Sequence, residues 1–176
     1  DPLSRRQMEQ GDWMARAEPG MFWNRLWCKV RKAEPKRPRA RLRYWDLAGT
    51  DPETNNTDPA FTASARMSLD MKTTVIEDVQ RCRKDPGGVM EFFERVAGED
   101  FEAYGPITQW IELDPGQAGK FELHQFKKAF PRFDIQGVRP TGDKPTRFKP
   151  VSAAARRGEV HLVAGDWNAP YHDELE

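Results

Sequence analysis

The stretch RYWDLAGT, residues 43–50, places an acid at the end of what otherwise has the composition of a buried strand. Tyr44 and Trp45 favour a strand, and the turn-rich segment DPETNNTDP follows directly after Thr50. A carboxylate at the end of such a strand is either a hydrogen-bonded structural acid or a metal ligand. Asp46 by itself does not decide between these two roles.

A second strand is expected to end in the same way. The segment ITQWIEL, residues 107–113, carries Glu112 just before the turn-forming DPGQAGK. If the two strands are parallel neighbours, their ends lie about 4.8 Å apart at the carboxyl edge of the sheet. Two carboxylates that close repel each other unless a divalent cation lies between them, and oxygen-only ligands favour Mg²⁺ or Mn²⁺ over zinc. The repeated pattern favours a metal site, although a structural role for each acid remains open.

The order of periodic segments predicts the fold class. Strand character with short links favours an antiparallel meander over residues 42–48, 61–70 and 73–83. Helical spacing then alternates with strands: helices are expected at 85–100, 120–130, 145–158 and 169–176, and strands at 107–113, 133–140 and 159–165. The sequence therefore predicts an α/β fold, a mixed sheet with helices on its faces.

Composition narrows the class of protein. A chain of 176 residues with 38% hydrophobic residues is typical of one soluble domain. No apolar run approaches 18 residues and the first residues lack the features of a signal peptide, so we expect an intracellular protein. Cys28 and Cys82 lie far apart and the three histidines occupy unrelated positions, which disfavours a zinc site or nucleophilic catalysis by serine or cysteine.

Basic residues are distributed unevenly although the formal net charge is zero. The segment KVRKAEPKRPRARLR, residues 29–43, carries eight basic residues against one acid and two prolines that disfavour a helix. It is either a solvated connector or a segment that lies along a phosphate backbone. The loop DPGQAGKF lacks a phosphate-binding loop's first glycine and its Ser or Thr, but its amides and lysine suit a DNA phosphate. The candidate DNA contacts are Lys36, Arg37, Arg39, Arg41, Lys120 and Lys144.

Four segments, taken in order, resemble a known family. RYWDLAGT, TDPAFTASARMS, WIELDPGQAGK and GDKPTRFKPVSAAARRGEVHLVAGDWNAPYHDELE are together similar to the C-terminal nuclease domain of the large terminase subunit of tailed bacteriophages and prophages. The resemblance implies a lead-in from an absent ATPase domain over residues 1–28. Residues 29–176 would then form the nuclease domain without its C-terminal end. It also implies a ribonuclease H-like sheet, with three antiparallel strands followed by parallel ones, helices on both faces, and the first and fourth strands adjacent.

The resemblance further implies an activity and its site. The expected protein is a metal-dependent endonuclease that cuts concatemeric double-stranded viral DNA with two Mg²⁺ or Mn²⁺ ions. By position, Asp46 matches the first catalytic acid and Glu112 the second, Asp114 a water-mediated ligand, and Asp58 an acid near the site. The family's third acid lies beyond DELE, so activity of this segment is expected to be weak.

Partners and rival functions follow from the same likeness. The expected partners are double-stranded DNA, an upstream ATPase domain, the portal and the small terminase subunit, in the host bacterial cytoplasm and without a membrane. One alternative is a noncatalytic module that grips DNA or docks onto the portal. Another is a transposase-like or resolvase-like enzyme of the same fold, since a fold does not fix a function.

Overall fold

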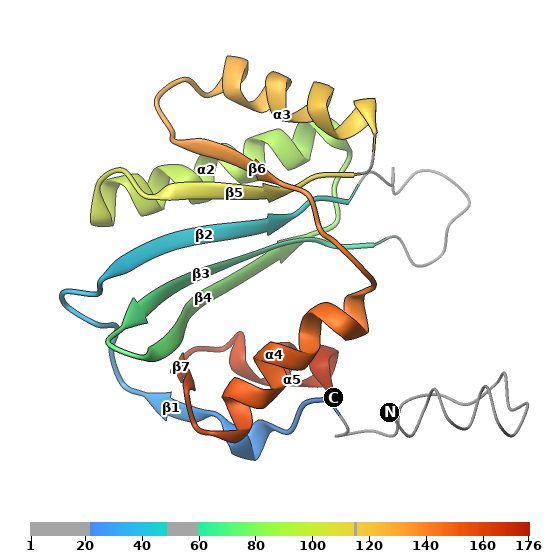
Figure 1. The fold of residues 1–176 in the computed structure, drawn as a ribbon. Coiled ribbons are helices and arrows are strands. Elements are labelled where there is room, and N and C mark those ends of the chain that lie inside the picture. The colour runs from blue at the N-terminus through green and yellow to red at the C-terminus, as the bar shows by residue number, and fades with distance from the viewer. Residues whose placement is uncertain (1–21, 49–59, 115) are drawn as a thin grey trace, which may run out of the picture.

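The computed structural model describes residues 22–48, 60–114 and 116–176 (Figure 1). The strands are β1 (Lys29–Arg31), β2 (Ala40–Asp46), β3 (Thr62–Asp70), β4 (Thr73–Cys82), β5 (Thr108–Glu112), β6 (Ile135–Val138) and β7 (Val160–Val163). The helices are the short 3₁₀ helix η1 (Arg25–Trp27), α2 (Pro86–Tyr104), α3 (Gln117–Ala129), α4 (Lys144–Arg156) and α5 (Asn168–Leu175). Within these described ranges, no helix is both long enough and apolar enough to cross a membrane.

All seven strands form one mixed sheet in the order β1-β7-β4-β3-β2-β5-β6. β2, β3 and β4 are the predicted antiparallel meander. The remaining pairs, β2 with β5, β5 with β6, β4 with β7 and β1 with β7, are parallel. The adjacency of β2 and β5, on which the carboxylate argument depends, is therefore confirmed.

Strand alternation separates two cores on the two faces of the sheet. Trp45 and Ile111 pair across β2 and β5 and pack with aromatic residues of α2 and α3. Leu42 lies three positions before Trp45, so it and its partner Met67 face the other way. On that second face, Met67 and Ile76 pack with residues of α4 and α5. Helices therefore cover both faces, as predicted, and Figure 1 shows the two helix pairs on either side of the strands.

The long helix α2 begins where the sequence predicts. Asp85 caps it by accepting a hydrogen bond from the backbone N–H of Gly88 at 2.7 Å, and Pro86 takes the first helical position. The helix ends at Gly105, whose φ of 75° suits a residue without a side chain. This start and end place one apolar stripe of α2 against Trp45 and Ile111.

The basic segment is not a single connector. Its first residues form β1, which pairs with β7, and its last residues form β2. The sequence analysis missed β1 because a three-residue strand has no detectable periodicity. Its backbone is ordered by the neighbouring strand β7, which is distant in sequence.

Residues 22–28 pack into the same fold. Trp23 is fully buried, and its indole Nε1 donates a hydrogen bond to Nδ1 of His172 at 3.0 Å. The guanidinium of Arg25 pairs with Asp173 at 2.9 Å and with Glu176 at 2.6 Å. This part of the expected lead-in is therefore attached to α5.

We expect acid to weaken this attachment. Burial, and next the charge of Arg25, lower the pKa of His172 below its ordinary value of 6.5. Between the two values the unfolded chain binds more protons than the folded chain, so stability declines as the pH falls below about 6.5. The melting temperature should therefore drop between about pH 7.5 and about pH 5, and drop less in His172→Gln, which can still accept from Trp23.

The same histidine comparison contains its own control. Burial also lowers the pKa of His161, but that residue is unchanged in both proteins and its effect cancels. Equal pH slopes for wild type and His172→Gln would show that the Trp23–His172 hydrogen bond does not cause the acid sensitivity.

Candidate active site

Asp46 and Glu112 end neighbouring parallel strands on one face of the sheet. Tyr44 pairs with Trp110, and Trp45 with Ile111, so the next residue of each strand brings the two acids opposite each other. Residues in register across parallel strands point to the same face. The side chain of Asp46 is 55% exposed and that of Glu112 is 18% exposed. The arrangement brings two carboxylates together at a solvent-accessible edge of the sheet.

Tyr44 and Arg147 hold Glu112 in place. The Tyr44 hydroxyl donates to Oε2 of Glu112 at 2.7 Å, and the Arg147 guanidinium lies 3.3 Å from both carboxylate oxygens. Burial favours the neutral form of Glu112, but the hydrogen bonds from Tyr44 and Arg147 outweigh it and lower its pKa. Burial, and next the contact with Glu112, raise the pKa of Tyr44, so it remains a donor. Glu112 is therefore ionised at neutral pH, the form that binds a cation.

Lys144 lies beside Asp46 at the start of α4. Its Nζ is 3.7 Å from Oδ2 of Asp46, and its charge also favours ionised Glu112. The helix begins there because Asp143 accepts a hydrogen bond from the backbone N–H of Thr146 at 2.9 Å. Figure 1 shows α4 beginning on the side of the sheet where β2 and β5 end. The site thus combines two carboxylates with two cations.

The other predicted acids are placed differently. Asp58 lies outside the described residues. Asp114 is exposed just after β5, and its backbone oxygen is so close to Gly119 that a Cβ there would be only 2.5 Å away. Gly119 thereby lets α3 pack onto the end of β5. Lys120, next along α3, is exposed. Within the described part of the chain, no group of three or more metal-binding side chains is formed.

The basic segment before β2 lies away from the two acids. Lys36, Arg37 and Arg39 are exposed, but they precede β2, whereas Asp46 ends it. The seven residues of β2 span about 20 Å at the usual rise of a strand. Arg41 is engaged elsewhere, because its Nε lies 2.7 Å from Oε2 of the buried Glu77 and its guanidinium stacks on Tyr104. The structure therefore brings only Lys144, of the six predicted DNA contacts, into contact with a predicted catalytic acid.

Two site residues were not predicted as such, although each had a signal. Tyr44 precedes Asp46 by two positions, which puts both on one face of a strand. Arg147 follows Lys144 by three positions, which puts both on one face of a helix. What the sequence did not indicate is that this helix face meets the ends of β2 and β5.

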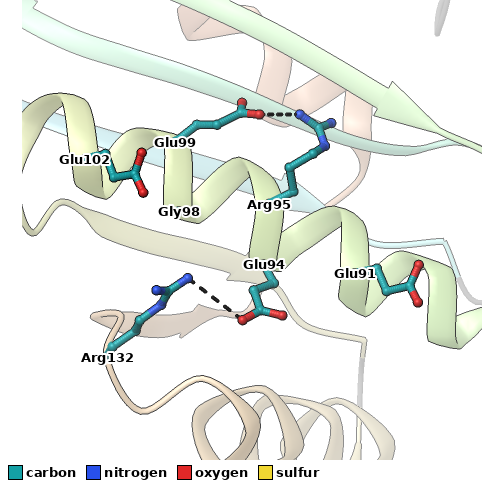
Figure 2. A pocket seen from close by; sticks show the side chains of 7 residues that line it. All are labelled: Glu91, Glu94, Arg95, Gly98, Glu99, Glu102 and Arg132. Carbon is teal, nitrogen blue, oxygen red and sulfur yellow. Dashed lines mark hydrogen bonds and ion pairs between the residues drawn. The ribbon is translucent and has the colours of Figure 1, made fainter.

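A shallow groove elsewhere on the molecule has a different character. Figure 2 shows it on the outer side of α2, lined by Glu91, Glu94, Arg95, Gly98, Glu99, Glu102 and Arg132. Arg95 pairs with Glu99 at 2.6 Å and Arg132 with Glu94 at 3.8 Å. With four glutamates against two arginines, the groove disfavours nucleic acid. It also lies on the helix that covers the face opposite to Asp46.

The sequence and the fold were compared with known proteins. The sequence pattern of the family described as the terminase RNaseH-like domain matches residues 43–176. A search of curated protein sequences found no match.

Similar solved structures are terminases. The full-length large terminase of a thermophilic bacteriophage has a TM-score of 0.54 at 11% identity, covering 81% of this chain and 32% of that chain. The human cytomegalovirus terminase nuclease domain has a TM-score of 0.57 at 9% identity, covering 78% and 73%. The large terminase nuclease of the thermophilic phage G20c with bound zinc has a TM-score of 0.53 at 14% identity, covering 88% and 85%.

These likenesses establish a ribonuclease H-like fold, and this chain spans about a third of the first of these large terminases. The G20c nuclease has also been solved with bound magnesium, and the cytomegalovirus domain after a manganese soak.

Proposed function

Because this chain belongs to the terminase RNaseH-like domain family, we propose that it is a metal-dependent DNA endonuclease module that cuts concatemeric double-stranded DNA during viral DNA packaging. The observation that carries the proposal is the meeting of Asp46 and Glu112 at the ends of adjacent parallel strands. Two carboxylates on one exposed edge, far apart in sequence, are otherwise electrostatically unfavourable.

The chemistry of the donors fits a hard divalent cation. Asp46 and Glu112 offer only oxygen ligands, which Mg²⁺ and Mn²⁺ prefer. We propose two such ions, with Asp46 shared between them, Glu112 on one of them, and Asp114 and Asp58 in supporting positions. When bound, such ions activate water and stabilise the leaving oxygen of a phosphodiester.

The remaining groups of the chain act on orientation and charge. Tyr44 fixes one oxygen of Glu112 through its hydrogen bond, so the carboxylate keeps one orientation. Lys144 and Lys120 are exposed cations placed to contact the DNA backbone without reading its sequence. Lys36, Arg37 and Arg39 remain proposed contacts for a more distant part of the duplex, whereas Arg41 already pairs with Glu77.

The proposal is tested by nicking of supercoiled plasmid in millimolar Mn²⁺. We expect Glu112→Gln to lower the nicking rate at least about tenfold, because the amide removes a charged ligand. Glu102→Gln, on the outer side of α2, is the matched control and should cut at the wild-type rate. Equal rates for Glu112→Gln and wild type would exclude Glu112 from the site. Wild type that binds DNA but never cuts it would favour the noncatalytic gripping module.

The wider setting is proposed from the family. In the full protein we expect an upstream ATPase domain, with the portal and the small terminase subunit as partners, in the host bacterial cytoplasm. Residues 1–28 are proposed to lead in from the ATPase domain and residues 29–176 to form the nuclease domain. Because residues 22–28 pack onto α5, movement of the upstream domain would be felt first at that helix.

A further inference from the structure

Arg147 has an unsaturated set of contacts. All its contacts with the Glu112 oxygens are 3.3 Å long, whereas charge-assisted bonds of this kind are usually about 2.7–2.9 Å. Its Nε is buried and has no hydrogen-bond partner among the described residues. Arg43, by contrast, contacts the carboxylates of Asp100 and Asp78 at 2.6–3.0 Å. The grip of Arg147 on Glu112 is thus loose for a partly buried arginine.

The cations at this site oppose the binding of a further cation. Arg147 neutralises Glu112, and Lys144 lies 3.7 Å from Asp46. A divalent ion that takes both carboxylates is repelled by the two positive side chains. Lys144 is 81% exposed and turns away at little cost, whereas Arg147 is 30% exposed and is directed at Glu112 from α4. Arg147 is therefore the cation that has to change partners.

We propose that Arg147 exchanges Glu112 for a phosphate of the DNA when a divalent cation binds, and so serves as a substrate-contacting residue of the nuclease. This inference rests on the proposed function. The planar guanidinium presents parallel N–H donors that match two phosphate oxygens, which a lysine does not. A phosphate also supplies an acceptor for the unpartnered Nε. The exchange keeps the local charge balanced both with and without DNA.

Tyr44 provides a contrast of opposite sign. Its hydroxyl is neutral and contacts only Oε2 of Glu112, at 2.7 Å, so it orients the carboxylate without competing for charge. Removing the hydroxyl should weaken cation binding, whereas removing the Arg147 charge should strengthen it. Loss of packing at this edge would instead weaken cation binding in both variants.

The test measures Mn²⁺ binding to the DNA-free protein, by electron paramagnetic resonance of unbound Mn²⁺ or by calorimetry. We expect Arg147→Gln to bind Mn²⁺ about tenfold more tightly at low salt, with the gain shrinking as salt rises. Tyr44→Phe should bind Mn²⁺ several-fold more weakly. Duplex binding, followed by fluorescence anisotropy in Ca²⁺, should weaken about fivefold in Arg147→Gln, and nicking should slow with it.

Two further variants complete the design. Arg147→Lys keeps the charge but not the fork, so we expect wild-type Mn²⁺ affinity with weakened duplex binding. Arg132→Gln removes a loosely paired arginine from the acidic groove and should change neither quantity. Thermal melts check that each variant is folded.

The outcomes separate this inference from the proposed function. Wild type that neither binds Mn²⁺ nor cuts DNA would overturn the nuclease proposal and the exchange with it. If wild type does both, unchanged or weaker Mn²⁺ binding in Arg147→Gln would overturn the exchange alone. Tighter Mn²⁺ binding with wild-type duplex affinity would also overturn it, because Arg147 would then have no role at the phosphate.

Discussion

Replacing Asp46 with asparagine is expected to reduce plasmid nicking in Mn²⁺ by about 100-fold or more. The proposed site gives Asp46 to both ions, so loss of its charge affects both, whereas Glu112 holds only one. The side chain is 55% exposed, so the fold should tolerate the change. The rate of loss of supercoiled plasmid gives the effect, and duplex binding measured in Ca²⁺ should stay within about twofold of wild type.

Asp114→Asn is the natural comparison for Asp46→Asn. Both remove one carboxylate charge near the end of a strand, but Asp114 is proposed only as a water-mediated ligand. Its variant should therefore lose less activity than Asp46→Asn. Unimpaired cutting by Asp46→Asn would show that the catalytic assignment is wrong, whatever the fold.

The second large effect is expected on stability, at Asp100→Asn. Asp100 is fully buried and accepts from Nε and Nη2 of Arg43 at 2.6 and 3.0 Å, and from Nη1 of Arg66 at 2.8 Å. Removing its charge leaves Arg43, also fully buried, with only Asp78 and Ser64 as partners. Breaking one side of a buried ion pair costs about 3 kcal/mol or more of unfolding free energy. Urea denaturation measures this change without screening the charges.

Glu99→Gln is the matched control for Asp100. It is the neighbouring residue on α2, it pairs with Arg95 at 2.6 Å, and both side chains are about half exposed. An exposed pair of this kind contributes below about 0.5 kcal/mol. A loss at Asp100→Asn no larger than the loss at Glu99→Gln would show that the buried network is not needed for stability.

The end of the basic segment shows why charge along the chain was an incomplete guide. Arg41 and Arg43 were part of a run that suited a phosphate backbone, and Arg41 was among the predicted DNA contacts. Alternation along β2 turns both toward α2, where Glu77 and Asp100 receive them. The partners lie 36 and 57 positions away in sequence, so no local pattern identifies them.

The candidate site was predictable in part for a similar reason. Asp46 and Glu112 each end a recognisable strand, and parallel neighbours carry their ends to one edge. Tyr44 shares a face with Asp46 by strand period alone. Arg147 was not identified, because its contact with Glu112 depends on where α4 crosses the sheet.

The sequence by itself determined the order of strands and helices, the antiparallel meander and the two strand-ending acids, because these depend on periodicity and turn residues within short windows. Only the tertiary structure decided that Arg43 is buried, that β1 is a strand, and that Arg147 and Lys144 face the two carboxylates. Each of those outcomes depends on a partner from another part of the chain, and ion pairs and edge-strand pairing gain their energy only when packing has brought such partners together.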